Sequence, residues 1–464
     1  MTDVPETTIA LTGNIYLEHP VSKLRNPRFR RVAEYLRGCE GTITNLECAI
    51  PDQEDWPAYM AGTGWSATYM GADPTMIDEL RYFGIDALYA ANNHVGDFGE
   101  LGILSTIRHL RERNMPFAGI GASLTEASEP AYFDTPGGQR VAVLSAFDWG
   151  PRRAMDLNFP WPWGQMASDD GPPYRTRPGV NLLRYTTETT VDRQTFDELR
   201  RASAYLGWEE AKAYRRGGAE RDLALIGPYM IDWETDSDDE FFFMGRKFVR
   251  GDGPGARTVA AQDDLERIYK YVREARRQAD IVVVALHDQS HGVGVYGHVD
   301  TLAHGAIDAG ADIFVNNAGR HRGIEIYEGK VILYGLPSLF LQNEQVTHVP
   351  TSALHLMNLG PDATSADFLD ARDQGTAKAP RISAPGRRGT VVFVVVFDAE
   401  GHAREVRIQP LEVSEGPRFR SGLPLWPDED STLVDQLLDR TRAHSEDFGT
   451  KIEESDGVGI VKVS

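Results

Sequence analysis

Three short hydrophobic runs in this chain end in side chains of the kind that bind metals. They are Ile43–Glu47, Ala87–His94 and Ile281–His287. Apolar runs of this length, flanked by turn-forming and helical segments, predict buried β-strands. The carboxyl ends of neighbouring parallel strands meet at one edge of a sheet, which is where α/β proteins place their ligands. We therefore predict a metal site at that edge, built from the carboxylate, amide and imidazole groups that end these runs.

Strand-like and helix-like segments alternate along most of the chain, which predicts an α/β fold with a largely parallel sheet. The alternation breaks between about residues 151 and 256, where Pro, Gly, Trp and acidic residues are frequent. It resumes with an expected helix at 261–278. We expect a single catalytic domain over residues 1–464, an insertion or lid at 151–256 within it, and a C-terminal extension with a helix at 411–464.

The charge balance restricts the partners that the chain can bind. Asp and Glu number 69 against 48 Lys and Arg, so the formal net charge is −21 at pH 7. Nucleic acid and anionic membranes require a basic face, and we expect neither as a partner. The sequence shows no apolar run long enough for a membrane span and no secretory leader. We therefore expect a soluble cytoplasmic protein.

Histidines are concentrated around the third apolar run. Five of the twelve histidines lie between His287 and His321. We treat His287, His291, His298 and His321 as candidate metal ligands, because imidazole serves Zn, Fe and Mn alike. For His291 and His321, the alternative is a loop histidine that hydrogen-bonds to the backbone. His304 falls within an expected helix and is interpreted as a surface residue.

Several phrases follow one another in an order that is typical of one family. These phrases are Thr44–Glu47, Ala90–Gly99, Phe117–Ala122, Ile307–Asp312 and Gly323–Tyr327. The ordered set resembles the CapA/PgsA family, named for capsule poly-γ-glutamate synthesis, within the calcineurin-like metallophosphoesterases. The resemblance covers roughly residues 8–150 and 258–410. It implies a four-layer αββα sandwich with two metal ions at the strand ends, Glu47 between the ions, Asn93 as a ligand and His94 as an acid or supporting residue.

Three positions depart from the pattern of that family. Asn14 stands where the family carries an Asp ligand, and Asn317 and Gly319 stand where two His ligands are expected. An amide offers only a neutral oxygen, so these changes should weaken one ion or shift it. We place Asn14 and His94 among the catalytic residues. The departures suggest a hydrolase scaffold whose site has been rebuilt.

The insertion carries aromatic side chains next to Pro and Gly. Apolar rings and a flexible Met in an irregular segment are suited to cover a site and to select an apolar substrate. The expected substrate-binding residues are Trp161, Trp163, Phe241, Phe243 and Met244. The alternative is that these side chains form a small core of their own within the insertion.

A two-metal site with an aromatic cover and without the usual phosphoesterase ligands is similar to the non-haem diiron monooxygenases of platensimycin and platencin biosynthesis. That resemblance implies O₂-dependent hydroxylation of a small apolar metabolite, such as a terpenoid-like acid or its acyl thioester. Two Fe ions and an electron donor would be required, although Mn or Zn would suit the same ligands. The alternative is a binuclear metal-dependent hydrolase, either a phosphoesterase or a CapA-like capsule poly-γ-glutamate enzyme. A non-catalytic capsule-associated or binding protein is the third possibility.

Overall fold

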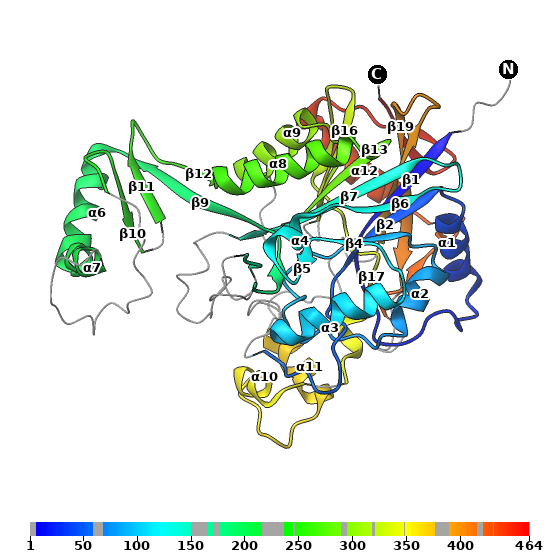
Figure 1. The fold of residues 1–464 in the computed structure, drawn as a ribbon, viewed down its shortest axis with the longest axis horizontal. Helices are drawn as coiled ribbons and strands as arrows, with labels where there is room; N and C mark the ends of the chain where they lie inside the picture. The colour runs from blue at the N-terminus through cyan, green and yellow to red at the C-terminus, as the bar shows by residue number, and fades with distance from the viewer. Residues whose placement is uncertain are drawn as a thin grey trace.

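The computed structural model describes most of the chain. The described residues are 6–58, 68–149, 166–169, 176–215, 236–244, 246–288, 295–317, 321–347, 349–375, 389–414, 421–429 and 431–463. Most of the described strands belong to two large mixed sheets that pack face to face, with helices on the outer side of each sheet (Figure 1). Among the described helices, none combines the length and the hydropathy that crossing a membrane requires.

The first sheet, which we call the β1 sheet, has the strand order β21-β22-β19-β18-β1-β2-β3-β4. Its strands are β1 (Thr7–Tyr16), β2 (Gly41–Leu46), β3 (Ala87–Tyr89), β4 (Phe117–Ala118), β17 (Phe340–Leu341), β18 (Gly389–Phe397), β19 (Ala403–Val413), β20 (Pro424–Leu425), β21 (Glu453–Ser455) and β22 (Val458–Lys462). β1, β2, β3 and β4 pair in parallel, so their carboxyl ends share one edge. β18 is antiparallel to β1 and links these strands to the C-terminal part of the chain.

The second sheet, the β13 sheet, has the order β10-β11-β9-β7-β13-β14-β16-β15. Its strands are β6 (Ala131–Asp134), β7 (Arg140–Trp149), β9 (Leu182–Val191), β10 (Glu240–Phe243), β11 (Arg246–Arg250), β12 (Gly255–Ala260), β13 (Ile281–His287), β14 (Ile313–Asn317), β15 (Gly323–Tyr327) and β16 (Lys330–Tyr334). β9, β7, β13, β14 and β16 are parallel, which brings their carboxyl ends to one edge as well. A short pair, β5 (Ile120–Gly121) with β8 (Gly179–Val180), lies outside both sheets.

Three buried cores separate four layers, which confirms the αββα sandwich. The first core joins the β1 sheet to helices α1 (Pro27–Arg37), α2 (Met76–Tyr82) and α3 (Gly99–Glu112). The second lies between the two sheets. The third joins the β13 sheet to α8 (Gln262–Arg276) and α9 (Gly297–Asp308). The remaining helices are α4 (Leu124–Ser128), α6 (Arg193–Tyr205), α7 (Trp208–Arg215), α10 (Thr351–Leu356), α11 (Ser365–Gly375), α12 (Leu433–Ser445), η3 (Asn343–Gln345) and η6 (Glu446–Phe448).

The central strand β13 shows why this sequence forms a strand between two cores. Every residue of β13 is buried, as expected for a strand that is covered on both faces. Successive side chains point to opposite faces. Ile281, Val283 and Ala285 enter the core between the sheets. Their neighbours Val282 and Val284 enter the core beneath α8 and α9. This alternation decides which face each polar residue at the end of the strand reaches.

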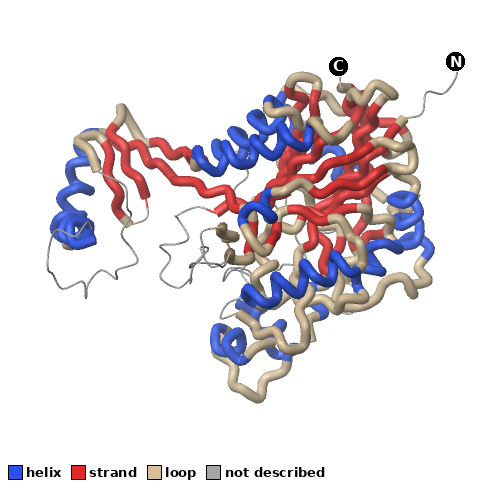
Figure 2. The backbone as a smooth tube through the Cα atoms, in the orientation of Figure 1, coloured by secondary structure: helices blue, strands red, loops and turns tan. Residues whose placement is uncertain are grey.

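Part of the predicted insertion forms an arm that leaves the body of the protein. The ten-residue strand β9 and the shorter β12 pair with each other and run outward together (Figures 1 and 2). Beyond them lie α6, α7, β10 and β11, which form a small lobe at the far end. This lobe has its own aromatic core, made of Phe196, Trp208, Phe241 and Phe243. The described part of the insertion is therefore largely regular in structure.

Candidate metal centre

Polar side chains from both sheets meet in the gap between the sheets at the carboxyl ends of the strands. His287 ends β13 on the same face as Ala285, and Asn317 ends β14 on the same face as Val315. From the opposite sheet come Asn14 of β1 and Asn45 of β2. All four polar side chains are buried. We call this group, together with Glu47 and Asn93, the inner cluster.

Asn14 stands at the centre of the amide contacts in the inner cluster. Its Oδ1 accepts a hydrogen bond from Asn45 Nδ2 at 3.0 Å and a further one from Asn317 Nδ2. Gly13 makes this position possible, because a Cβ there would lie 2.2 Å from the carbonyl oxygen of Pro337. The strand therefore passes closer to a neighbouring backbone than any side chain would allow. Asn14 is thus fixed where the family resembled by the sequence carries an Asp.

His287 connects the amides with the carboxylate of the inner cluster. Its Nε2 lies 3.0 Å from Asn93 Oδ1, and its Nδ1 lies 3.1 Å from Asn317 Nδ2 and 3.6 Å from Glu47 Oε2. Burial lowers the pKa of His287, so the ring is neutral at neutral pH. A neutral ring that donates from Nε2 to Asn93 keeps a lone pair on Nδ1. That lone pair faces Glu47 and Asn317.

A buried histidine–aspartate pair adjoins the inner cluster. His94 Nδ1 lies 2.7 Å from Asp97 Oδ2, which also accepts a hydrogen bond from the backbone N–H of Met70 at 2.8 Å. Burial by itself lowers the pKa of His94, but the Asp97 carboxylate more than offsets this effect, and the resulting pKa is raised. Asn92 fixes the turn, because its Oδ1 accepts from the backbone N–H groups of His94 and Val95. The imidazole is therefore held in one orientation.

The inner cluster fits a divalent metal ion. It offers amide oxygens from Asn14 and Asn93, a carboxylate from Glu47 and an imidazole from His287, a mixed oxygen and nitrogen set that suits Mn, Fe or Zn. Asn317 Oδ1 is fully buried and has no hydrogen-bond partner among the residues that the structure describes. A buried polar atom without a partner is costly, and a bound cation would satisfy it. The prediction of Glu47, Asn93 and His287 as ligands remains a prediction that this geometry supports.

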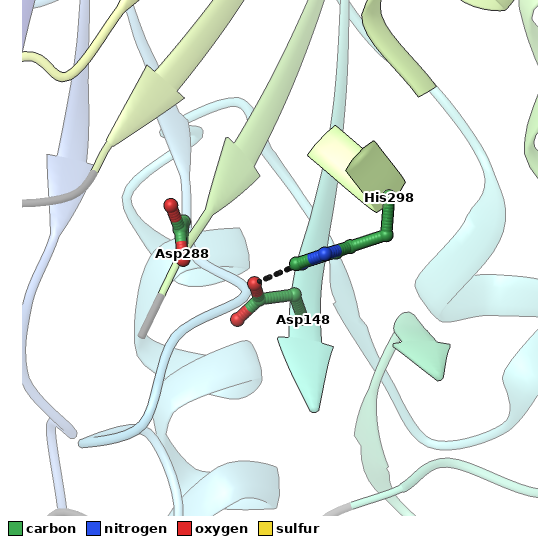
Figure 3. Close-up of side chains that lie close together, drawn as sticks. All are labelled: Asp148, Asp288 and His298. Carbon is green, nitrogen blue, oxygen red and sulfur yellow. Dashed lines mark hydrogen bonds and ion pairs between the residues drawn. The ribbon is translucent and has the colours of Figure 1, made fainter. Parts of the chain in front are cut away.

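His298 lies in a different place from the one predicted. It belongs to α9, and its Nε2 lies 2.8 Å from Asp148 Oδ2 at the end of β7 (Figure 3). Asp288, directly after His287, completes a group whose ligand-type atoms all lie within 4.8 Å of one another. We call these three residues the outer cluster. Strand alternation places it on the face of the β13 sheet that α9 covers, because Ala146 and Leu286 lie in that core.

The other predicted histidine ligands do not join the inner cluster in the described structure. The ring of His321 lies 5.2 Å from that of Phe393 and 6.3 Å from that of His444, centroid to centroid. Burial lowers the pKa of His321 to about 3. The next residue, Arg322, turns the other way and contacts Asp288. His291 lies outside the described residues.

The described members of the predicted aromatic substrate wall do not lie at the strand ends. Phe241 and Phe243 pack into the aromatic core of the distal lobe, and Met244 is exposed in the turn after β10. The physical reason is that α6 and α7 supply apolar partners locally, so these rings are covered without reaching the body. This outcome corrects the expectation for these three residues and matches the alternative of a separate small core. Trp161 and Trp163 lie outside the described residues.

Sequence reasoning missed several polar residues of both clusters. Asn45 precedes Glu47 by two residues, which places it on the same face of β2, and Asp97 follows His94 by three residues. Both could have been found from spacing alone. Asp148 and Asp288 each lie just beyond an expected strand, but nothing in the sequence indicates that they meet.

These observations define a class of protein: an αββα sandwich with metal-ligand side chains at the strand ends between its two sheets. A family model, the bacterial capsule synthesis protein PGA_cap, matches residues 8–340. The chain belongs to this family. The resemblance to CapA that the ordered motifs indicated is thereby confirmed at the level of the family.

Individual proteins are similar to this chain over different lengths. The uncharacterized protein y4sH of Sinorhizobium fredii is 27% identical over 470 aligned residues, which cover 98% of this chain and 93% of that protein. A probable polyglutamine synthesis accessory protein of Mycobacterium tuberculosis is 27% identical over 247 residues, or 53% of this chain and 42% of that protein. Capsule biosynthesis protein CapA of Bacillus anthracis is 25% identical over 146 residues, or 30% and 34%. These names support the capsule family and not the resemblance to a diiron monooxygenase.

Proposed function

We propose that the chain is a metal-dependent hydrolase whose reaction takes place at the inner cluster. The observation that carries the proposal is the His94–Asp97 pair, with 2.7 Å between Nδ1 and Oδ2, buried beside a group of metal-ligand side chains. A general acid must be held in one orientation next to the reacting bond. The hydrogen bond to Asp97 supplies that orientation, and it leaves Nε2 as the atom that can give a proton.

Each residue has a part in the proposed reaction. A bound divalent ion supplies Lewis acidity and lowers the pKa of water, which makes hydroxide available at neutral pH. Glu47, Asn93 and His287 would hold such an ion. Asn14 accepts the hydrogen bonds that keep the Asn45 and Asn317 side chains in place. His94 would protonate the leaving group from Nε2, while Asp97 stabilises the imidazolium before the transfer and orients the ring.

The substrate class follows from the family and from the chemistry of the site. Relatives carry names that refer to capsule or polyglutamine synthesis, which favours an amide substrate such as a γ-glutamyl bond. A phosphoester is the other substrate that such a centre hydrolyses. Asn14 and Asn317 are neutral where the resembled family carries ligands, so we expect slow turnover of simple phosphomonoesters and phosphodiesters.

The test compares two histidines that are each paired with an aspartate. Purified protein is loaded with Mn(II), Zn(II) or Fe(II) and assayed on bis(p-nitrophenyl) phosphate and on poly-γ-glutamate. His94→Gln should lower turnover by about 100-fold or more, the usual effect of removing a general acid. His109→Gln is the matched control, because His109 belongs to α3, outside both clusters, and its Nε2 lies 2.9 Å from Asp52 Oδ1. Equal losses in the two variants, or full activity of His94→Gln on every substrate cleaved, would contradict the proposal.

Diiron monooxygenation of a small apolar metabolite is the second candidate. It is favoured by the neutral amides of Asn14 and Asn317, which lower the negative charge that a two-ion hydrolytic centre uses. The position of Phe241 and Phe243 in the distal lobe removes the argument for an apolar substrate wall from those residues. Elemental analysis after growth in iron-rich medium, with O₂ consumption in the presence of a reductant, separates the two candidates. Iron occupancy with ¹⁸O₂ incorporation into a terpenoid-like acid would establish the oxygenase.

A further inference from the structure

The outer cluster lies apart from the inner one although the two are neighbours in sequence. Asp288 follows His287 directly, and Asn316 precedes Asn317. Because side chains alternate along a strand, each such pair divides between the two faces of the β13 sheet. His287 and Asn317 reach the gap between the sheets, whereas Asp288 and Asn316 contact each other on the outer face. The outer cluster is therefore not an extension of the proposed hydrolytic centre.

The outer cluster has the ligand types and the burial of a metal site. It combines one imidazole and two carboxylates, a set that suits Zn, Fe(II) or Mn. His298 is 0%, Asp148 1% and Asp288 3% exposed, and their ligand-type atoms converge to within 4.8 Å. The three residues come from separate elements, namely α9, β7 and the end of β13, so their convergence is a product of the fold (Figure 3).

The side chain of Asn316 is further evidence for a ligand bound in the outer cluster. Asn316 is completely buried, and its Nδ2 lies 3.4 Å from Asp288 Oδ2. Among the described residues its Oδ1 has no hydrogen-bond partner. A rotation of the amide about its last bond exchanges oxygen and nitrogen without changing its shape. The oxygen would then face the Asp288 carboxylate, an arrangement that a cation bound between the two oxygens would stabilise.

Two residues of the arm strands fix the orientation of the His298 imidazole. His298 Nδ1 lies 2.8 Å from Thr258 Oγ1 on β12, and the ring of Tyr185 on β9 stacks on it with centroids 3.9 Å apart. A metal-bound imidazole typically has its other nitrogen engaged in this way. Arg322 also contacts the outer cluster, with 2.6 Å between its Nη1 and Asp288 Oδ2, and its guanidinium balances the charge of that carboxylate.

We propose that Asp148, Asp288 and His298 bind a divalent transition-metal ion, with the amide oxygen of Asn316 as a fourth donor. This ion is separate from any metal of the inner cluster. Its role is structural: through Thr258 and Tyr185 it fixes the base of the arm to the edge of the β13 sheet. The site does not depend on the proposed hydrolase function.

Metal content and cobalt titration test the proposal. In a Glu47→Ala/His287→Ala variant, which lacks two inner-cluster ligands, mass spectrometry should still find about one equivalent of metal. Adding His298→Ala should remove that equivalent and weaken Co(II) binding at least about tenfold. His304→Ala is the control on the same helix, and it also tests the half-buried group of Asp300, His304 and Glu325.

Several outcomes would overturn the proposal. One is a folded Glu47→Ala/His287→Ala variant that holds no metal, since the carboxylates of the outer cluster would then be stable without a bound ion. Another is loss of the remaining metal in His304→Ala instead of His298→Ala. If His298→Ala does not fold, as judged by circular dichroism, Asp288→Asn carries the same test, and unchanged Co(II) affinity in that variant would contradict the site.

Discussion

The two faces of the β13 sheet carry polar groups of opposite character at the same edge. The inner cluster is dominated by amides, with Glu47 as its carboxylate and a neutral His287. The outer cluster is ionic, with Asp148 and Asp288 beside Arg322. Neutral groups can be buried together once they are hydrogen-bonded, whereas buried charges need partners of opposite sign. The inner cluster is therefore suited to bind and release a ligand, and the outer cluster is suited to a permanent structural contact.

The largest effect on the free energy of unfolding is expected when the outer cluster loses the guanidinium of Arg322. Arg322→Met removes the guanidinium from the buried Asp288 carboxylate, and breaking a buried ion pair in this way costs about 3–5 kcal/mol. Urea denaturation measures the loss. Arg257→Met is the control, because its ion pair with Glu188 is exposed on the arginine side and should contribute less than about 1 kcal/mol. Equal losses of stability in both variants would show that the buried ion pair of the outer cluster contributes no more than an exposed one.

A smaller effect is expected when the neutral face gains a charge. Asn14→Asp can still accept hydrogen bonds from Asn45 and Asn317, and it adds a negative charge beside Glu47. Affinity for a divalent ion rises with ligand charge, and we expect Mn(II) to bind about tenfold more tightly. Isothermal titration provides the measurement. Asn26→Asp, a helix-cap exchange on α1, is the control, and weaker or unchanged binding by Asn14→Asp would place the ion elsewhere.

The smallest effect is expected in the pH dependence of stability, to which the buried His321 beside Phe393 contributes. Burial lowers the pKa of His321 to about 3, below its ordinary value, so between those two values the unfolded chain binds a proton that the folded chain does not. Stability should therefore fall as pH decreases, by about 1 kcal/mol between about pH 6.5 and about pH 5.5. In His321→Phe this part of the pH dependence should vanish. His402→Phe, an exposed position, should leave it unchanged, and a dependence that persists in His321→Phe would refute the assignment.

Much of the fold could be predicted from the period of the hydrophobic residues. The run Ile281–His287 is buried on both faces, and its apolar residues alone indicate a central strand. The polar residue at its end could then be placed at a sheet edge. The family resemblance added the second sheet and the four layers, which no periodicity reveals. Glu47, Asn93, His94 and His287 do lie together in the structure, because the carboxyl ends of β2 and β3 in one sheet face that of β13 in the other.

The outer cluster could not be predicted, because neighbours in the sequence need not be neighbours in space. His298 is close to His287 in the sequence, yet its contact is Asp148, which lies 150 positions earlier in the chain. That contact depends on which helix covers which face of the sheet. The prediction that the aromatic residues bind substrate failed for a related reason. The hydrophobicity of Phe241 indicates that the ring is buried, but not where, and α6 and α7 bury it at the far end of the arm.

The strict alternation of β13 also limits how this part of the gene can change. Substitutions at Val283 or Ala285 alter one core, and a compensating change nearby can restore the packing. Inserting or deleting one codon within the strand, between Ile281 and His287, has no such remedy, because a shift of one residue moves every later side chain to the opposite face. His287 and Asp288 would exchange places, and both clusters would be lost together. Variation in this strand should therefore occur by replacement, and length changes should be confined to the loops around it.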